Sequence, residues 1–380
     1  MDQENQFSDA QSVPHSNVLA VSDLKIDYRS QGRLISAVNG VSFSIREKTI
    51  LGIVGESGSG KSSVGLAIMR LLPKNGKSSG SIVFVGTDLA SIKDKSISRY
   101  RGTGMTMIFQ EPMTSLNPVM TVGDQLTEAL VVKMARQLKY PSIGPYSYAP
   151  STNEDAPSFT NPSSASVFQS RFGFSRHGSV SVEEAQAKAP KQVLNALKKV
   201  RLTDPIRTAR KYPHQLSGGE RQRVMIAMAY ILEPRLLIAD EPTTALDVTT
   251  QAQVLKLMLE LRNDIGTSIL FISHDLLVVA QVSDEIAVMY AGEFVEKADT
   301  QELFTNSLHP YTKGLMESIP KTYKGEGRLS PIPGSYSGSS ANISACKFRT
   351  RCKFAFPRCS SEEPKLMEKS SGHYVACHLY

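Results

Sequence analysis

The sequence has 380 residues, of which 41% are hydrophobic, and a formal net charge of +7. This length is enough for a large core in two domains, or in one domain with appendages. No stretch approaches the roughly 18 to 20 uninterrupted apolar residues of a membrane-spanning helix, so we expect none. Lysines and arginines are scattered without a run of five or more, which favours a solvated surface over a nucleic-acid site.

Two segments lack the pattern of a folded core. Residues 1–17 are polar and have neither the basic start nor the apolar middle of a signal peptide. We therefore expect a disordered tail on a protein that stays in the cytoplasm. Residues 140–181 are rich in serine and proline and show no sustained periodicity. They predict a disordered insertion in a helical region, a tolerated surface loop rather than a regulatory element.

Strand patterns and helical patterns alternate along the rest of the chain. Five segments are typical of strands, the first two half-buried and the others fully buried: 18–26, 37–45, 51–54, 235–239 and 268–272. Three segments have helical periodicity: 61–72, 221–232 and 250–265. Buried strands alternating with helices predict a largely parallel sheet that is covered on both faces. Ligands of such sheets bind at the carboxyl ends of the strands.

Residues 55–62 form a phosphate-binding motif in the required context. They read Gly-Glu-Ser-Gly-Ser-Gly-Lys-Ser, which fits G-x-x-x-x-G-K-[ST] between a predicted strand and a predicted helix. Glycines let the backbone wrap around phosphates, and the helix N-terminus favours negative charge. We expect Lys61 to reach the β- and γ-phosphates of ATP and Ser62 to bind Mg²⁺. The expected ATP-binding residues here are Gly55, Glu56, Ser57, Gly58, Ser59, Gly60, Lys61, Ser62 and Ser63.

Two adjacent carboxylates, Asp240 and Glu241, follow the buried strand pattern at 235–239. Such a pair is costly beside a buried strand unless a cation or another partner compensates it. We expect Asp240 to hold Mg²⁺ through water and Glu241 to orient and polarise the water that attacks ATP.

Residues 216–220, Leu-Ser-Gly-Gly-Glu, precede the helical pattern at 221–232. Ser217 and Glu220 are spaced as a helix capping box. The two glycines between them would expose a row of backbone N–H groups, which suits a second phosphate site.

With these residues in place, the chain resembles the ABC-type ATPases. Residues 216–220 look like the signature motif of that family, and Gln110 looks like its Q-loop glutamine. Asp247, in Ala-Leu-Asp at 245–247, resembles the D-loop, and His274 resembles the switch histidine. Tyr28 occupies the place of the aromatic residue that stacks on adenine.

The resemblance implies a fold and a set of roles. The implied fold is an α/β P-loop NTPase of the ABC ATPase type. It has a parallel-sheet core, an antiparallel β subdomain, a helical subdomain and a small cysteine-rich C-terminal extension. The catalytic residues would be Glu241, His274 and Gln110. The Mg²⁺ site would comprise Ser62, Gln110 and Asp240. Residues that bind ATP in trans would be Ser217, Gly218, Gly219, Glu220 and Asp247.

Three further segments resemble the dipeptide and oligopeptide importer ATPases. They are 110–118, 212–219 and 308–315, the last reading Leu-His-Pro-Tyr-Thr-Lys-Gly-Leu. The resemblance implies a nucleotide-binding domain over 18–300 and an importer-type extension over 301–380.

All four cysteines fall in that extension, at Cys346, Cys352, Cys359 and Cys377. Four clustered cysteines in a cytosolic chain indicate metal more than disulfides. The chemistry fits zinc or iron–sulfur, and the resemblance favours a [4Fe–4S] cluster. Zn²⁺ and four unrelated thiols are the alternatives.

The resemblance also implies partners. A second, related ATPase subunit would close head to tail around two ATP molecules. Two permease subunits and a substrate-binding protein would complete an importer for peptides or similar solutes, with this chain at the cytoplasmic face of the membrane. The alternative is a soluble ABC ATPase that acts on ribosomes or DNA. A single phosphate loop and the segment 308–315 favour the importer, and no nucleic-acid partner is expected.

Overall fold

The computed structural model describes residues 17–111, 115–139, 182–319, 332–334 and 345–380. The tail at 1–16 and the segment 140–181, both predicted to be disordered, lie outside the described residues. Residue Asn17, which we assigned to the tail, is the first residue of a strand.

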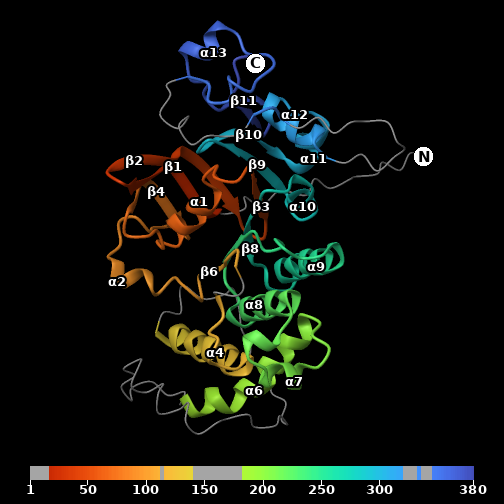
Figure 1. Cartoon of the computed structure of the whole chain (residues 1–380). Coiled ribbons are helices and arrows are strands. Elements are labelled where there is room, and N and C mark those ends of the chain that lie inside the picture. Colours follow the sequence, from red (N-terminus) through yellow and green to blue (C-terminus); the bar gives the residue numbers. More distant parts are fainter. Residues whose placement is uncertain (1–16, 112–114, 140–181, 320–331, 335–344) are drawn as a thin grey trace, which may run out of the picture.

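Two sheets organise the chain (Figure 1). The first is antiparallel, with four strands in the order β2-β1-β4-β5. These strands are β1 (Asn17–Ser30), β2 (Arg33–Arg46), β4 (Gly76–Phe84) and β5 (Thr87–Asp88). The second has eight strands in the order β11-β12-β10-β9-β3-β8-β7-β6. They are β3 (Ile50–Val54), β6 (Met105–Ile108), β7 (Leu236–Asp240), β8 (Ser268–Ser273), β9 (Glu285–Tyr290), β10 (Glu293–Asp299), β11 (Met367–Ser370) and β12 (His373–Val375).

The second sheet is parallel at its centre and antiparallel at one side. Strands β6, β7, β8, β3 and β9 pair in parallel, while β10, β12 and β11 add antiparallel pairs. The predicted parallel core is therefore present. Its extension by β9 to β12 was not foreseen.

Alternate residues of the central strands pack into two different cores. On β3, Ile50 and Val54 face one core and Leu51 and Ile53 face the other. The first core joins the sheet to the helices of the lower lobe in Figure 1, and the second joins it to α1 and the antiparallel sheet. Because both faces are covered, the interiors of these strands are apolar, as a buried parallel sheet requires.

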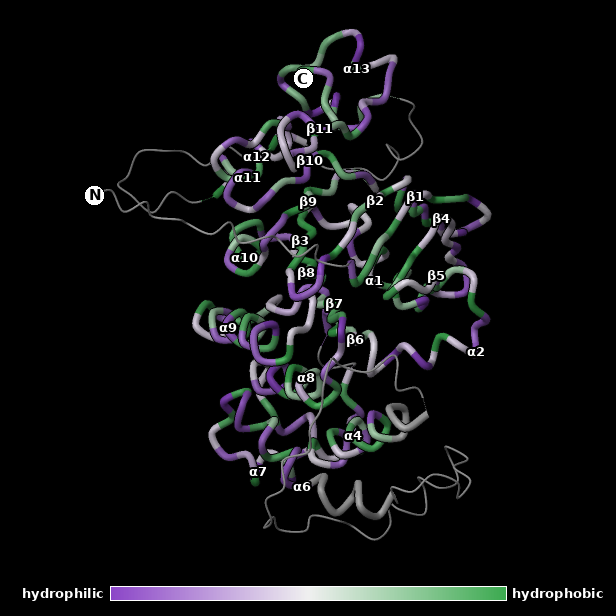
Figure 2. The backbone as a smooth tube through the Cα atoms, turned by 180° about the vertical axis from the view of Figure 1, so that it is seen from behind, coloured by the Kyte–Doolittle hydropathy of each residue, from purple (hydrophilic) through white to green (hydrophobic). Residues whose placement is uncertain are grey.

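The helices fall into groups along the chain. Around the sheets lie α1 (Lys61–Ile68), α2 (Asp94–Ile97), α9 (Val248–Ile265) and α10 (Leu276–Ala280). The lower lobe comprises α4 (Val122–Lys139), α6 (Val182–Lys199), α7 (Pro205–Arg210), the 3₁₀ turn η2 (Pro213–Gln215) and α8 (Gly218–Leu232). The C-terminal part adds α11 (Thr300–Thr305), α12 (Pro310–Glu317) and α13 (Pro357–Ser361). Hydrophobic and hydrophilic stretches alternate along α9 in Figure 2, as expected for a helix with one buried face, whereas most residues of α8 from Val224 to Leu232 are buried.

The three predicted helices each differ from the observed ones at one end, and α9 begins at Val248 rather than at residue 250. Helix α1 ends at Ile68 rather than at residue 72, because Arg70 takes a left-handed φ of 51° and Pro73 follows. Helix α8 begins at Gly218, since the predicted capping box of Ser217 and Glu220 is formed.

Candidate nucleotide-binding site

The phosphate loop connects β3 to α1, as the sequence predicts. Gly60 has a φ of 103°, and a Cβ atom there would lie 2.4 Å from the carbonyl oxygen of Ala37. Only glycine fits both conditions. The loop therefore passes tightly against the antiparallel sheet and delivers Lys61 at the start of α1.

Lys61 lies inside the loop that precedes it. Its Nζ donates hydrogen bonds of 2.8 Å to the carbonyl oxygens of Gly55 and Glu56, and only 4% of the residue is exposed. Burial lowers the pKa of Lys61, and the carboxylates of Glu241, Asp240 and Glu56 oppose that shift. A cation held in this way is placed to meet phosphate oxygens.

Ser62 and Asp240 come together beside the lysine. The Ser62 hydroxyl donates a 2.9 Å hydrogen bond to Oδ1 of Asp240. Burial raises the pKa of the Asp240 carboxyl, which is 5% exposed. A hydroxyl and a carboxylate are hard oxygen ligands, which Mg²⁺ prefers. The donor set of this site therefore fits that ion.

Three side chains converge on one oxygen of Glu241. Its Oε2 accepts hydrogen bonds from Gln110 Nε2 at 3.0 Å and from Thr244 Oγ1 at 2.8 Å, and it lies 3.2 Å from His274 Nδ1. The backbone of Glu241 has a φ of 47°, a strained conformation for a residue with a side chain. The family resemblance placed Gln110 and His274 in one catalytic set with Glu241. The sequence did not predict Thr244, although Thr243 and Thr244 form a polar pair soon after the carboxylates.

Tyr28 also reaches the start of α1. Its hydroxyl donates a 3.0 Å hydrogen bond to Oγ of Ser63, one residue beyond the predicted Mg²⁺ ligand. The edge of its ring packs on Gly76, where a Cβ atom would lie 2.8 Å away. The ring is thus fixed next to the phosphate loop.

The signature residues form a second group. Oγ of Ser217 accepts from the backbone N–H of Glu220 at 3.2 Å, and the Glu220 carboxylate accepts from the N–H of Ser217 at 2.8 Å. This backbone hydrogen bond from Ser217 is the main cause that lowers the pKa of Glu220. Gly219 packs on Thr250 at the start of α9, where Oδ1 of Asp247 accepts from the Thr250 N–H at 2.9 Å.

Across the described residues, no hydrogen bond or ion pair connects this second group to the phosphate loop of the same chain. Gly218 has open space around its Cβ position. The structure therefore assembles residues 28, 55–63, 110, 240, 241 and 274 into one site and leaves 217–220 and 247 apart from it.

The four cysteines lie in the C-terminal part of the chain. The N–H of Cys346 donates to the carbonyl of Cys359 at 3.0 Å. Burial raises the pKa of Cys346 to about 11 and also raises the pKa of Cys352 and Cys377. Among the described residues, no group of three or more His, Cys, Asp or Glu side chains is arranged to hold a metal ion. The donor chemistry of four thiols fits a cluster, but the described geometry gives no support for one.

The packing of the thiols gives a physical reason for this difference. Cys346 and Cys352 pack against the main hydrophobic core, and Cys359 is 8% exposed. In these positions the cysteines act as small apolar side chains. The expected [4Fe–4S] cluster, and Zn²⁺ as its alternative, therefore have no support in the geometry.

A membrane span is also absent from the described part of the chain, since no helix there is both long and apolar enough to cross a bilayer.

The parallel sheet, the phosphate loop and the carboxylates after β7 define an ATP-binding cassette ATPase. Comparison with known proteins agrees. Residues 38–244 match the family model described as ABC transporter, and residues 295–359 match the one described as oligopeptide/dipeptide transporter, C-terminal region. The chain belongs to the ABC transporter family, among its ATP-hydrolysing subunits.

Relatives of known name cover almost the whole chain. The oligopeptide transport ATP-binding protein AppD of Bacillus subtilis is 40% identical over 96% of this chain and 97% of its own length. The dipeptide transport ATP-binding protein DppD of the same organism is 39% identical over 95% and 94%. Among solved structures, the dimeric post-hydrolysis state of the cassette MJ0796 has a TM-score of 0.54 at 23% identity. It covers 74% of this chain and 98% of that protein, and it supports the fold alone.

Proposed function

We propose that this chain hydrolyses ATP to energise a membrane importer of dipeptides, oligopeptides or similar solutes. The observation that carries the ATPase part is the convergence of Gln110, Thr244 and His274 on Glu241, beside the Ser62–Asp240 pair. The match of residues 295–359 to a peptide-transporter region supports the choice of solute.

Each residue of the site has a role in this proposal. Lys61 leaves its two loop carbonyls and binds the β- and γ-phosphates. Ser62, Gln110 and Asp240 would hold Mg²⁺, Asp240 through water, and the ion would neutralise phosphate charge. Glu241, oriented by its three neighbours, accepts a hydrogen bond from the attacking water and polarises it. Tyr28 presents its ring to adenine.

The second group of residues acts across a dimer. Ser217, Gly218, Gly219, Glu220 and Asp247 would meet the nucleotide of the partner ATPase subunit. Their separation from the phosphate loop of their own chain, with open space at Gly218, supports this arrangement. ATP binding then closes the dimer, and hydrolysis with product release reopens it.

The proposed partners are a second ATPase subunit, two transmembrane permeases and a substrate-binding protein. The ATPase would lie at the cytoplasmic face of the membrane. The nucleotide-binding domain spans 18–300 and the importer-type extension 301–380. The alternative of a ribosome- or DNA-directed ATPase finds no support, because the related proteins are named for transport.

We also propose that the tail holds a metal, from the cysteine content of the sequence. Four thiols within residues 346–377 match the donor set of a [4Fe–4S] cluster, and zinc is the alternative. Elemental analysis of anaerobically purified protein decides it. About four irons per chain support the cluster, and about one zinc supports the alternative. Protein that contains neither iron nor zinc refutes the proposal of a metal-bound tail.

Membrane fractionation tests the importer function. Expressed with its neighbouring genes, the chain should co-purify with integral membrane proteins. Recovery of the chain and its ATPase activity in the soluble fraction, without integral membrane proteins, would contradict the assignment.

A further inference from the structure

The C-terminal part of the chain holds the phosphate loop directly. Arg351 forms a two-pronged ion pair with Glu56, the second residue of that loop. Nη1 donates to Oε2 at 2.8 Å and Nη2 donates to Oε1 at 2.9 Å, although the residues are 295 positions apart. This geometry is the strongest that an arginine and a carboxylate adopt.

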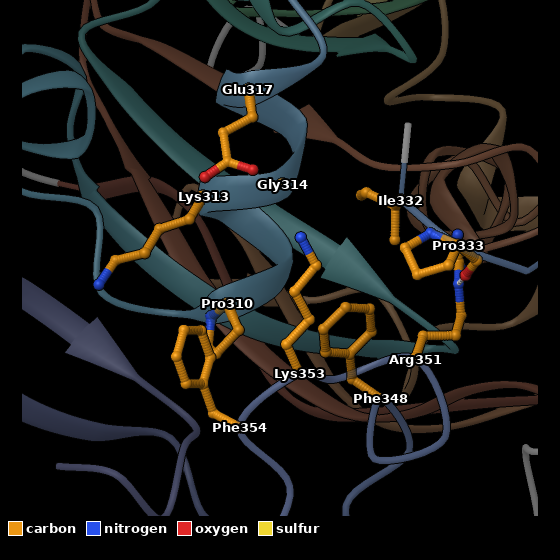
Figure 3. A pocket seen from close by; sticks show the side chains of 10 residues that line it. All are labelled: Pro310, Lys313, Gly314, Glu317, Ile332, Pro333, Phe348, Arg351, Lys353 and Phe354. Carbon is orange, nitrogen blue, oxygen red and sulfur yellow. Dashed lines mark hydrogen bonds between the residues drawn. The ribbon is translucent and has the colours of Figure 1, made fainter. Parts of the chain in front are cut away.

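Arg351 is fixed by its surroundings as well as by Glu56. Its side chain is only 7% exposed. The guanidinium carbon lies 5.8 Å from the ring centre of Tyr290 and 5.9 Å from that of Phe348, and Nε donates to the carbonyl of Pro333 at 2.9 Å. Figure 3 shows Arg351 next to Pro333 and Phe348. An arginine held this way places its charge at one point rather than sampling many.

The backbone of Glu56 is held by the same part of the chain. Its N–H donates a 3.0 Å hydrogen bond to the hydroxyl of Tyr311, which lies on α12 and is fully buried. The Tyr311 ring packs on Tyr290 at 4.7 Å and on Phe348 at 5.4 Å between centroids. Backbone and side chain of one loop residue are thus both fixed by residues after 310.

The charge of Glu56 bears on nucleotide binding. Lys61 donates to the carbonyl of Glu56, and the Glu56 carboxylate lies close enough to act electrostatically on the Lys61 ammonium group. A carboxylate close enough to act on Lys61 also acts on the phosphates that Lys61 would bind. It repels these phosphates unless a cation compensates its charge. In the structure, Arg351 is that cation.

We propose that Arg351 is a positioning residue for ATP binding, which neutralises Glu56 and, with Tyr311, fixes the phosphate loop in its ATP-accepting form. The inference rests on the proposed ATPase function and extends it to residues outside the cassette motifs. The simpler interpretation is that the ion pair only attaches the C-terminal part to the cassette. The two interpretations differ in what happens when both charges are removed.

Four full-length variants separate them: Arg351→Met, Glu56→Gln, the double variant and Lys353→Met. Lys353 is the matched control, because it carries the same charge, lies two residues away and lines the same pocket of about 170 Å³ (Figure 3). The affinity for ATP is measured by titration, and thermal unfolding is followed alongside.

Arg351→Met should weaken ATP binding about tenfold, since an uncompensated charge then faces the phosphates. Glu56→Gln removes the repelling charge together with the ion pair, so it should weaken ATP binding less than Arg351→Met does. The double variant should recover most of the loss, because the repelling charge is gone, and Lys353→Met should bind as the unaltered protein does. The substitutions should raise KM for ATP and leave kcat unchanged. The lost interaction weakens the bound ground state and the transition state equally.

Two results would overturn the inference. One is ATP affinity of Arg351→Met equal to that of Lys353→Met. The other is a double variant that binds ATP no better than Arg351→Met, which is the outcome of a merely structural ion pair. If Arg351→Met does not fold, Arg351→Lys replaces it, because lysine keeps the charge without the two-pronged geometry. The ATP affinity of Arg351→Lys should be less than threefold below that of Glu56→Gln. A larger loss counts against charge compensation. Lys61→Ala tests the proposed ATP site independently of Arg351. Unchanged ATP affinity of Lys61→Ala would refute the site itself.

Discussion

The side-chain amide of Gln110 donates a 3.0 Å hydrogen bond to Oε2 of Glu241, across 131 residues of sequence. Gln110 follows β6 and Glu241 follows β7, two neighbouring parallel strands. Movement of the segment after β6 therefore changes the environment of the carboxylate that we assign to catalysis. Four predictions test this site and the structure that supports it.

Glu241→Gln should keep ATP binding and reduce turnover by several powers of ten. The amide has the shape of the carboxylate but cannot polarise water in the hydrolytic step. Steady-state ATPase assays on the assembled transporter check the rate, and nucleotide titration checks the binding. Thr244→Val removes one of the three donors to Glu241 and should cost far less. Substantial turnover by Glu241→Gln would refute the assignment of this residue.

Lys61→Ala should weaken nucleotide binding itself. The ammonium group that now bonds the carbonyls of Gly55 and Glu56 is the only cation of the loop, and the bound phosphates lose its charge-assisted hydrogen bonds. Titration with ATP measures the effect, with circular dichroism to confirm folding. Affinity equal to that of the unaltered chain is the contrary outcome.

Glu293 should make stability depend on pH. Burial raises its pKa from 4.5 to about 7, with a contribution from Glu363, while its ion-pair partner Lys347 opposes the shift. A carboxyl with a raised pKa binds more protons in the folded state, so its contribution to stability falls as pH rises from about 4.5 to about 7. The total change is at most about 3 kcal/mol.

Glu293→Gln imitates the protonated form and should flatten this decline. Denaturant unfolding at pH 5 and pH 8 measures the free energy of unfolding of both proteins. The value of the variant minus that of the unaltered protein should be larger at pH 8 than at pH 5. A difference that does not vary with pH, or varies in the opposite direction, argues against the raised pKa.

Glu296→Ala should destabilise the C-terminal part of the fold. This fully buried carboxylate accepts hydrogen bonds from the N–H groups of Leu308 and His309 and lies 2.8 Å from Nε2 of His373. The substitution removes the partner of the buried His309 N–H and one of the two partners of His373, at a cost of about 2 to 4 kcal/mol. Denaturant unfolding gives the value. Glu302→Gln, at the exposed end of the same network, is the control and should have a much smaller effect.

The site was predictable from the sequence where neighbouring residues carry the information. The phosphate loop, the pair Asp240–Glu241 and the capping box at 217–220 are each encoded within a few residues, and the structure forms all three. Gln110 and His274 required the family resemblance, because nothing local indicates that they meet Glu241.

Other features could not be predicted because they depend on distant pairing. Strands β10 and β12 are short and lie 70 or more residues apart, so their pairing of Glu296 with Val375 has no local signal. The same holds for Arg351 and Glu56. The cysteines show the opposite problem: their clustering suggested metal ligands from chemistry alone, whereas Cys346 and Cys352 pack against the main hydrophobic core.

The pairing of β12 with β10 has a consequence for the order of synthesis. Strand β10 is joined through β9 to β3, the strand that leads into the phosphate loop, and its outer edge is covered by residues 373–375. While the ribosome is still making the stretch from 300 to 372, that edge has no partner and can pair with another nascent chain. The cassette of this protein therefore depends, for a shielded sheet, on a segment that is translated well after β10 itself.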